Sequence, residues 1–353
     1  MSINEWVLSA ALAIGLVYGG VAQVSGFCLN SALRQQVMQG NGHKLRSFML
    51  AVVVAMVGTQ VASGLGLIDL SDSIYLTTGL SWLLIPLGGM MFGYGMIMAR
   101  GCGARTLVLL GQGNLRSLVV LLCIGISAFM ALTGVISPLR ADVAQATSAT
   151  LGSASIVGEY LRWGFVIAFC GSLLLFVFSD KQFLKQRKDI FGGLIIGSLV
   201  VAGWLATGWL GFDDFEPTPL TSLTFVGPVG STIQYSMIAT GMDLNFGIVV
   251  VLGVIIGSFI AAHLGGQFRL IGFEEHTPMP RYIIGGILMG VGGALAMGCS
   301  VGQGLTGLST LSYVSMIAFA GILLGAWLAL RRELSVITPP KPVHRQHRRE
   351  QHQ

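Results

Sequence analysis

Three of the five cysteines in this 353-residue chain lie close to glycine in short, similar strings. A neutral thiol is soft, polarizable and a weak S–H donor, and glycine lets a ligand approach the backbone closely. The pattern therefore favours contact with a soft ligand. Free cysteine is also a common small buried hydrophobe, the role we expect for Cys123 and Cys170. The three strings are Gly26-Phe27-Cys28, Gly101-Cys102-Gly103 and Gly298-Cys299-Ser300.

The spacing of these cysteines does not match the usual metal or disulfide frameworks. The chain has no CxxC pair and no Cys/His pair, which are the spacings that indicate zinc sites or redox motifs. We therefore expect neither a metal nor a cofactor.

The elements that must position these thiols lie in a membrane. Hydrophobic residues make up 53% of the chain, charged residues 10%, and the mean hydropathy is +0.77. Soluble domains carry about 25% charged residues. This composition excludes a cytosolic enzyme, a nucleic-acid-binding protein and a disordered chain. We expect an all-α polytopic membrane protein that is not an enzyme.

The apolar segments fall into two length classes, because a bilayer-spanning helix needs about 20 residues. Four shorter segments predict re-entrant half-helices, which are allowed where broken backbone is buried in protein; interfacial loops are the alternative. These shorter segments are 26–38, 102–113, 222–239 and 299–311. Nine spans are predicted at 6–24, 46–68, 80–99, 117–137, 159–178, 190–210, 246–265, 281–297 and 314–330.

The basic residues predict the orientation in the membrane. With the N-terminus outside, 18 of the 20 lysines and arginines fall in cytoplasmic segments or, as Arg46 does, at the helix ends beside them, as the positive-inside rule requires. These segments are 25–45, 100–116, 179–189, 266–281 and the tail from 331. The C-terminus is thus predicted to be cytoplasmic, with a basic, disordered tail attracted to the anionic lipid bilayer surface.

An internal repeat appears at an offset of 197 residues. It predicts a first repeat over 1–137, a connector with one transmembrane helix over 138–189, a second repeat over 190–330 and the tail 331–353. A single connecting span inverts the second copy, and inverted repeats with broken helices indicate a transporter. Gly88, Gly89, Gly93, Gly95, Ala99, Gly101 and Cys102 match Gly285, Gly286, Gly290, Gly292, Ala296, Gly298 and Cys299.

The expected ligand is a small anion with a soft atom, such as a sulfur oxyanion. A half-helix that begins inside the bilayer offers unpaired N–H groups and the positive end of its dipole. The middle portions of the spans lack Asp and Glu, which argues against a proton or cation pump. Arg100 is either an anion contact or a cytoplasmic anchor. The predicted pathway comprises Cys28, Cys102, Cys299, Gly101, Gly103, Gly298, Ser300 and Arg100.

Other polar and aromatic residues have expected structural roles. We expect the polar residues after the cysteines, such as Thr106 and Gln303, mainly to satisfy broken backbone. Trp163, Trp204 and Trp209 are predicted to lie in the interfacial belts.

Several strings resemble those of the YeeE/YedE sulfur-transport family over nearly the whole chain. They are Gly-Phe-Cys28-Leu-Asn, Gly93-Tyr-Gly-Met-Ile-Met-Ala-Arg-Gly-Cys102 and the segment from Met289 through Cys299 to Ser309. The resemblance implies an hourglass-shaped bacterial inner-membrane protein with a periplasmic N-terminus. It also implies thiosulfate uptake, with Cys28, Cys102 and Cys299 passing the ion along by S–H contacts. Some members work with a small cytosolic sulfur-carrier protein of the TusA type.

The topology predicts an order for these contacts: entry near Cys299, passage at Cys102 and exit past Cys28. One departure from the family pattern is Arg105, a charge at a position expected to be small or polar. The alternatives are another soft sulfur or selenium species, sulfur transfer through a cysteine persulfide, and a membrane scaffold for a cytosolic partner.

Overall fold

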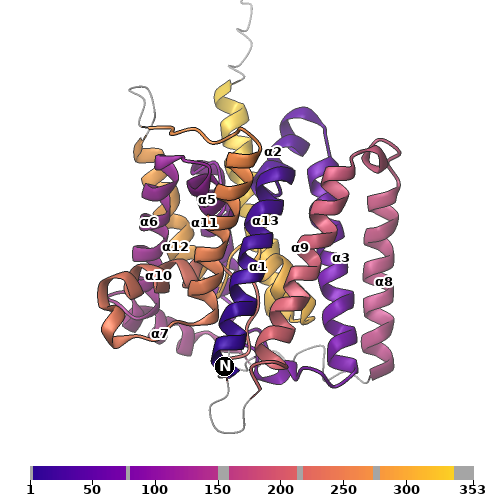
Figure 1. The fold of residues 1–353 in the computed structure, drawn as a ribbon, viewed down its shortest axis with the longest axis horizontal. Coiled ribbons are helices and arrows are strands. Elements are labelled where there is room, and N and C mark those ends of the chain that lie inside the picture. Colours follow the sequence, from indigo (N-terminus) through magenta and orange to yellow (C-terminus); the bar gives the residue numbers. More distant parts are fainter. Residues whose placement is uncertain (1–2, 77–79, 150–158, 213–217, 273–278, 338–353) are drawn as a thin grey trace, which may run out of the picture.

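The computed structural model describes residues 3–76, 80–149, 159–212, 218–272 and 279–337. In this part of the chain the helices run side by side in one bundle, with the start of α1 at one end and the end of α13 at the other (Figure 1). The only strands among the described residues are β1 (Leu80–Ser81) and β2 (Ser148–Ala149), which pair antiparallel. The chain is an all-α polytopic membrane protein, as predicted.

Nine helices coincide with the nine predicted spans. Six of them, α1, α3, α6, α9, α11 and α13, are long and apolar enough to cross a membrane. Of the remaining three, α4 and α12 have 15 and 17 residues and the described side chains of α8 cover Arg162–Phe178, so the count of nine crossings stays a prediction. The nine are α1 (Ile3–Ser25), α3 (His43–Gly64), α4 (Leu84–Met98), α6 (Leu115–Leu132), α8 (Glu159–Phe178), α9 (Arg187–Gly208), α11 (Phe246–Leu264), α12 (Met279–Leu295) and α13 (Tyr313–Ile337).

The four predicted short segments also contain helices, each too short to span a bilayer. They are α2 (Leu29–Gln39), α5 (Gly103–Gly111), α10 (Val226–Ile238) and η5 (Gly302–Gly307), of which η5 is wound as a π-helix. In Figure 1, α2 and α5 lie toward the end of the bundle where α13 finishes, whereas α10 lies toward the end where α1 starts.

Short connecting helices complete the described chain. One of them, α7, lies in the predicted connector and was not expected from the sequence; it begins with Pro138 in its first turn and buries none of its residues. The connecting helices are α7 (Ser137–Ala146), η1 (Leu70–Asp72), η3 (Phe183–Lys185) and η4 (Ala239–Gly241).

Packing between the long helices follows matched pairs. Helix α4 packs on α13 and α12 packs on α6, while α1 packs on α11 and α3 packs on α9. An offset of 197 residues converts the α4–α13 contact into the α12–α6 contact; in the other set it carries α3 onto α11 but carries α1 onto only the last turns of α9. Glycine permits these approaches: a Cβ at Gly93 would meet the Ile322 carbonyl, and one at Gly290 would meet the Ile124 carbonyl.

Candidate functional site

Cys102 and Cys299 are placed by the same kind of helix end. Helices α4 and α12 end at Met98 and Leu295, and two residues further on Arg100 and Met297 each have a left-handed φ of 56°. The next N–H in each copy reaches back to the last helical turn: Gly101 donates to Met96 O at 3.1 Å and Gly298 donates to Gly293 O at 2.8 Å. This is the Schellman arrangement that ends a helix. Each cysteine follows immediately, inside the bundle.

Each cysteine then begins a new helical segment. The Cys102 carbonyl accepts the Thr106 N–H at 2.9 Å, and the Cys299 carbonyl accepts the Gln303 N–H at 2.7 Å. In the second copy the Gly302 N–H also donates to Cys299 Sγ at 3.3 Å. Both thiols therefore lie at helix N-termini, where free N–H groups and the dipole favour an anion.

Cys28 joins Cys102 from the other broken segment. Helix α1 ends at Ser25, Gly26 takes a left-handed φ of 64°, and Cys28 precedes the first residue of α2. The Cys28 and Cys102 sulfur atoms are 3.9 Å apart. Cys28, Cys102 and Cys299 are 5%, 2% and 0% exposed. Residues far apart in the sequence thus form one buried cluster.

Tyr18 and Ser300 also border the cluster, and of the two only Ser300 was named in the sequence analysis. Tyr18 is buried, its ring lies 5.1 Å from that of Phe225, and its hydroxyl interacts electrostatically with all three thiols. A tyrosine inside an apolar span has no sequence signal that separates it from a packing residue. Ser300 was predicted, and its fully buried hydroxyl lies beside the Cys102 thiol.

The arginines near Cys102 have different environments. Arg100 is exposed at the end of α4, so the structure does not bring its side chain into the thiol cluster. Arg105 lies in the first turn of α5, is half-buried and donates from Nη1 to the Ala22 carbonyl at 3.2 Å. Of the two, Arg105 is the one that faces the cluster.

The polar side chains after the cysteines bind backbone, as expected. Asn30 Nδ2 donates to Met96 O, Thr106 Oγ1 to Cys102 O, and Gln303 Nε2 to Ala296 O. Gln303 thereby satisfies the Ala296 carbonyl just beyond the end of α12, whereas the Met96 and Cys102 carbonyls already accept a backbone N–H and gain a second donor. All three bonds hold the short segments in place.

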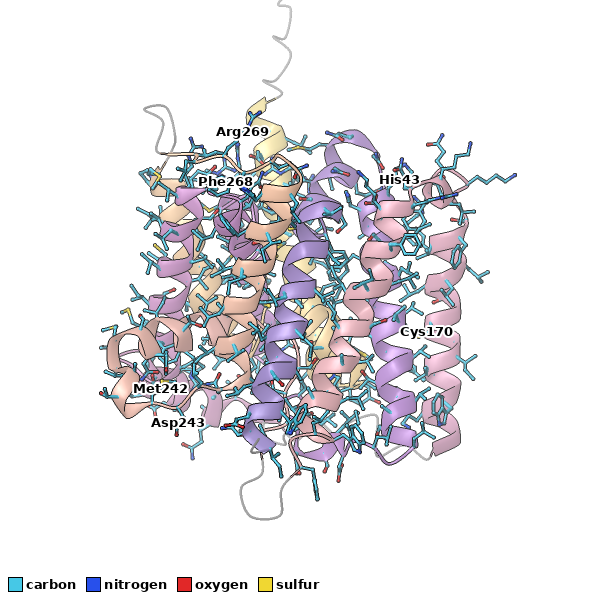
Figure 2. All side chains as sticks on the ribbon, viewed as in Figure 1. His43, Cys170, Met242, Asp243, Phe268 and Arg269 are labelled. Atoms are coloured by element: carbon cyan, nitrogen blue, oxygen red, sulfur yellow. The ribbon has the colours of Figure 1, made fainter. Side chains whose placement is uncertain are left out.

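The remaining cysteines and one tryptophan belong to the packing. Cys170, labelled on α8 in Figure 2, places Sγ 3.6 Å from Met56 Sδ, away from the thiol cluster. The interfacial prediction for Trp204 is wrong: it is 0% exposed and donates from Nε1 to Ser309 Oγ at 3.2 Å. Because its indole N–H donates to a buried hydroxyl, burying the ring leaves no polar group without a hydrogen bond. Trp209 is 60% exposed.

A cavity of about 670 Å³ opens at the end of the bundle where α1 begins. Its polar lining includes Thr221, Ser222, Thr224 and Asn245. Thr224 lies next to Gly302, since a Cβ at Gly302 would be 2.7 Å from Thr224 Oγ1. Because the Gly302 N–H donates to Cys299 Sγ, this side of the cavity lies near that thiol. Within the described part of the chain, no group of three or more His, Cys, Asp or Glu side chains is placed to hold a metal ion.

At the opposite end of the bundle, an ion pair lies near the α1–α2 break. Lys44 Nζ, at the start of α3, lies 2.6 Å from Asp189 Oδ1 at the start of α9 and also donates to the Ser25 carbonyl. Ser25 is the last residue of α1. The bond thus fastens three helices near the α1–α2 break.

A bundle of apolar helices that is interrupted at buried, cysteine-bearing helix ends defines a multi-pass membrane protein with an internal polar site. Comparison with known families makes this more specific: the model of the sulphur transport family matches residues 24–328, and the chain belongs to that family.

Two curated relatives carry the same printed description. The chain is 25% identical over 343 residues to "Thiosulfate transporter TsuA" of Escherichia coli (strain K12), covering 92% of this chain and 94% of that protein. It is also 25% identical over 339 residues to "Thiosulfate transporter TsuA" of Spirochaeta thermophila, covering 91% and 98%.

Proposed function

We propose that this chain imports thiosulfate, or a related small sulfur anion, across the bacterial inner membrane. The observation that carries the proposal is the buried cluster of Cys28, Cys102 and Cys299 at helix ends. Membership of the sulphur transport family and the description of the two relatives support the same class of cargo.

The cluster has the donors that a sulfur oxyanion needs. Neutral S–H groups donate weakly to a terminal sulfur, and the free N–H groups at the start of α5 favour the oxyanion end. The described acidic side chains lie near the ends of the long helices or in the connections between them. A thiolate or carboxylate in the path would repel an anion, so the thiols act in their neutral form.

The charge bias of the loops sets the orientation of the proposed path in the membrane. With the N-terminus in the periplasm, the cavity beside Thr224 faces outward and leads to Cys299. The anion then passes Cys102 and leaves past Cys28 toward the Lys44–Asp189 pair. A cytosolic sulfur-carrier protein of the TusA type would receive the sulfur at the basic inner face.

Two inverted repeats with re-entrant half-helices account for this path. The matched ends at Arg100 and Met297, both with φ of 56°, support a two-fold relation between the halves. Half-helices from opposite sides then meet at the centre, which gives the hourglass form with a narrow middle at Tyr18 and Phe225.

Growth on thiosulfate tests the proposed cargo. Bacteria that lack sulfate uptake would express the native chain, Cys102→Ala or Cys123→Ala, with thiosulfate as the sole sulfur source. We expect growth with the native chain and with Cys123→Ala, but not with Cys102→Ala at equal membrane levels. Growth with all three would reduce Cys102 to packing. Growth with none, at normal expression, would refute thiosulfate import.

Thiol labelling tests the order of contacts. Variants that retain one of the three cysteines would be treated from the periplasmic side with a membrane-impermeant thiol reagent. We expect Cys299 to react before Cys102, and Cys28 to react only from the cytoplasmic side. Reaction of Cys28 from outside would overturn the proposed order.

A further inference from the structure

Arg105 is a half-buried cation in the wall of the thiol cluster. It lies three residues after Cys102 in the first turn of α5, and its Nη1 donates to the Ala22 carbonyl of α1 at 3.2 Å. Ala22 is one helical turn beyond Tyr18, whose hydroxyl interacts electrostatically with the thiols and with Arg105. Cys28 interacts electrostatically with Arg105 as well. The guanidinium therefore borders the cluster from the α5 side.

The described contacts of Arg105 include no carboxylate. Its recorded hydrogen bond goes to a neutral carbonyl, and the ion pairs of the described residues involve other basic side chains. A guanidinium has five N–H donors, and a partly desolvated cation without a counter-ion is costly. An anion beside Cys28 and Cys102 would supply the missing charge.

A buried hydroxyl also lies at this place. The Ser300 side chain is 0% exposed and its hydroxyl lies beside the Cys102 thiol. A hydroxyl can accept one hydrogen bond and still donate its own proton, so a neutral Cys102 S–H that donates to Ser300 leaves the Ser300 O–H for a ligand. Arg105 and Ser300 thus offer donors to the same space beside Cys102.

The fold does not require a charge at this position. At the 197-residue offset, Arg105 corresponds to Gly302, which begins η5 without a side chain and donates its N–H to Cys299 Sγ. The two segments follow matched helix ends, α5 beginning three residues after Arg100 and η5 five residues after Met297. A glycine satisfies the geometry in one half, so the arginine in the other half serves something other than packing.

We propose that Arg105 determines specificity by binding the oxyanion end of the cargo, while Cys28 and Cys102 contact its soft sulfur. Arg105 then makes the Cys28–Cys102 pair the main resting place of the anion, ahead of Cys299. This inference rests on the proposed anion transport.

Alkylation of the thiols measures the charge of Arg105 without any transport. Purified protein carrying Cys123→Ala and Cys170→Ala would be treated with anionic iodoacetate or neutral iodoacetamide, and modification of Cys28 and Cys102 followed by mass spectrometry. The ratio of the two rates cancels the reactivity of the thiol itself. In Arg105→Gln we expect the iodoacetate to iodoacetamide ratio to fall about tenfold, as one charge at ~10 Å and effective dielectric ~20 implies.

Two variants control this measurement. Arg105→Lys keeps the charge and should keep the ratio. Arg140→Gln removes an arginine that likewise donates to a backbone carbonyl, Ala131 O at 3.0 Å, but lies on α7; its ratio should not change. An unchanged ratio in Arg105→Gln would overturn the proposal.

Uptake kinetics separate this inference from the proposed function. In vesicles, Arg105→Gln should raise KM for thiosulfate about tenfold with a smaller change in kcat, and Arg105→Lys should restore most of it. A wild-type protein that takes up no thiosulfate but keeps the Arg105-dependent alkylation ratio would refute thiosulfate and support the anion site. Normal thiosulfate uptake with KM unchanged in Arg105→Gln would refute the role of Arg105 alone.

Discussion

The halves of the molecule around Cys102 and around Cys299 share a backbone and differ in what lines it. Each helix before the cysteine is followed by a residue with φ of 56°, and each cysteine comes two residues later. The lining diverges: Cys28 in the first half corresponds to Phe225 in the second, and Arg105 corresponds to Gly302. The frame sets where ligand groups stand, and the side chains placed on it set which ligand they accept.

This difference assigns distinct tasks to the two halves. The half around Cys102 has two sulfur atoms 3.9 Å apart and a nearby guanidinium. The half around Cys299 offers one thiol, which accepts a backbone N–H at 3.3 Å, near a wide cavity whose mostly apolar lining carries a few polar side chains. The second is suited to admit anions and the first to hold and select them.

The largest expected effect concerns the close backbone contacts that the two halves share. Gly93→Val and Gly290→Val should each abolish most folded protein, because a Cβ there would meet the Ile322 and Ile124 carbonyls respectively. Overpacking costs about 1–3 kcal/mol where side chains yield, and backbone yields less. Detergent-solubilised protein would be measured by size-exclusion chromatography, with Gly171→Val as control because its Cβ meets nothing within 4 Å. Tolerance of one substitution but not the other would contradict a frame of equal tightness.

Oxidation should act on one half only. With Cys123 and Cys170 replaced by alanine, mild copper–phenanthroline treatment should join Cys28 to Cys102, whose sulfur atoms need to move from 3.9 Å to about 2 Å. Cys299 should remain a free thiol by mass spectrometry. Thiosulfate uptake should fall to background and return after reduction, whereas a Cys28→Ser variant should resist the treatment. A disulfide between Cys102 and Cys299 instead would contradict the described pairing of Cys28 with Cys102.

A smaller effect is expected at Gly302, where the half around Cys299 has no side chain. In Gly302→Ala the new Cβ would lie 2.7 Å from Thr224 Oγ1 and 3.4 Å from Tyr75 Oη, so it narrows the way from the cavity to Cys299. Uptake should fall about threefold to tenfold, corresponding to an overpacking cost of ~1 kcal/mol, while the protein stays folded. Adding Thr224→Ala should restore part of the rate. Gly164→Ala, which meets nothing within 4 Å, should transport normally.

Most of the helices and their breaks could be predicted from the sequence. Fewer of the side chains that face the thiols could. Span length and glycine-cysteine strings located the broken segments to within a few residues. The left-handed conformation at Arg100 and Met297 carries no sequence signal, because glycine is the usual residue there. Nor did spacing show that Arg105, and not Arg100, faces the thiols. That choice depends on the direction of α5, which only packing against α1 determines.

The 3.9 Å contact between Cys28 and Cys102 was equally beyond sequence reasoning. The two residues are 74 positions apart and approach through different broken segments. The same holds for Trp204, where hydropathy predicted an interfacial position. Its burial depends on the Ser309 hydroxyl, 105 positions away, being available as an acceptor.

Trp204 gives the smallest and most local test of the comparison. Helix α5 in the first half is regular, whereas η5 in the second is π-helical, and Trp204 donates to Ser309 just after it at 3.2 Å. Trp204→Phe should lower the free energy of unfolding by about 1 kcal/mol for the lost hydrogen bond, since the Ser309 hydroxyl still donates to Thr306 O at 2.7 Å.

Thermal unfolding in detergent would measure the change, with Trp209→Phe as a matched control because Trp209 is 60% exposed. We expect the control to be nearly neutral and thiosulfate uptake by Trp204→Phe to change less than twofold. Equal stability of the two variants would mean that the Trp204 bond does not support η5. A large loss of uptake in Trp204→Phe would instead extend the selective machinery into the half around Cys299, against the division of tasks drawn from Arg105 and Gly302.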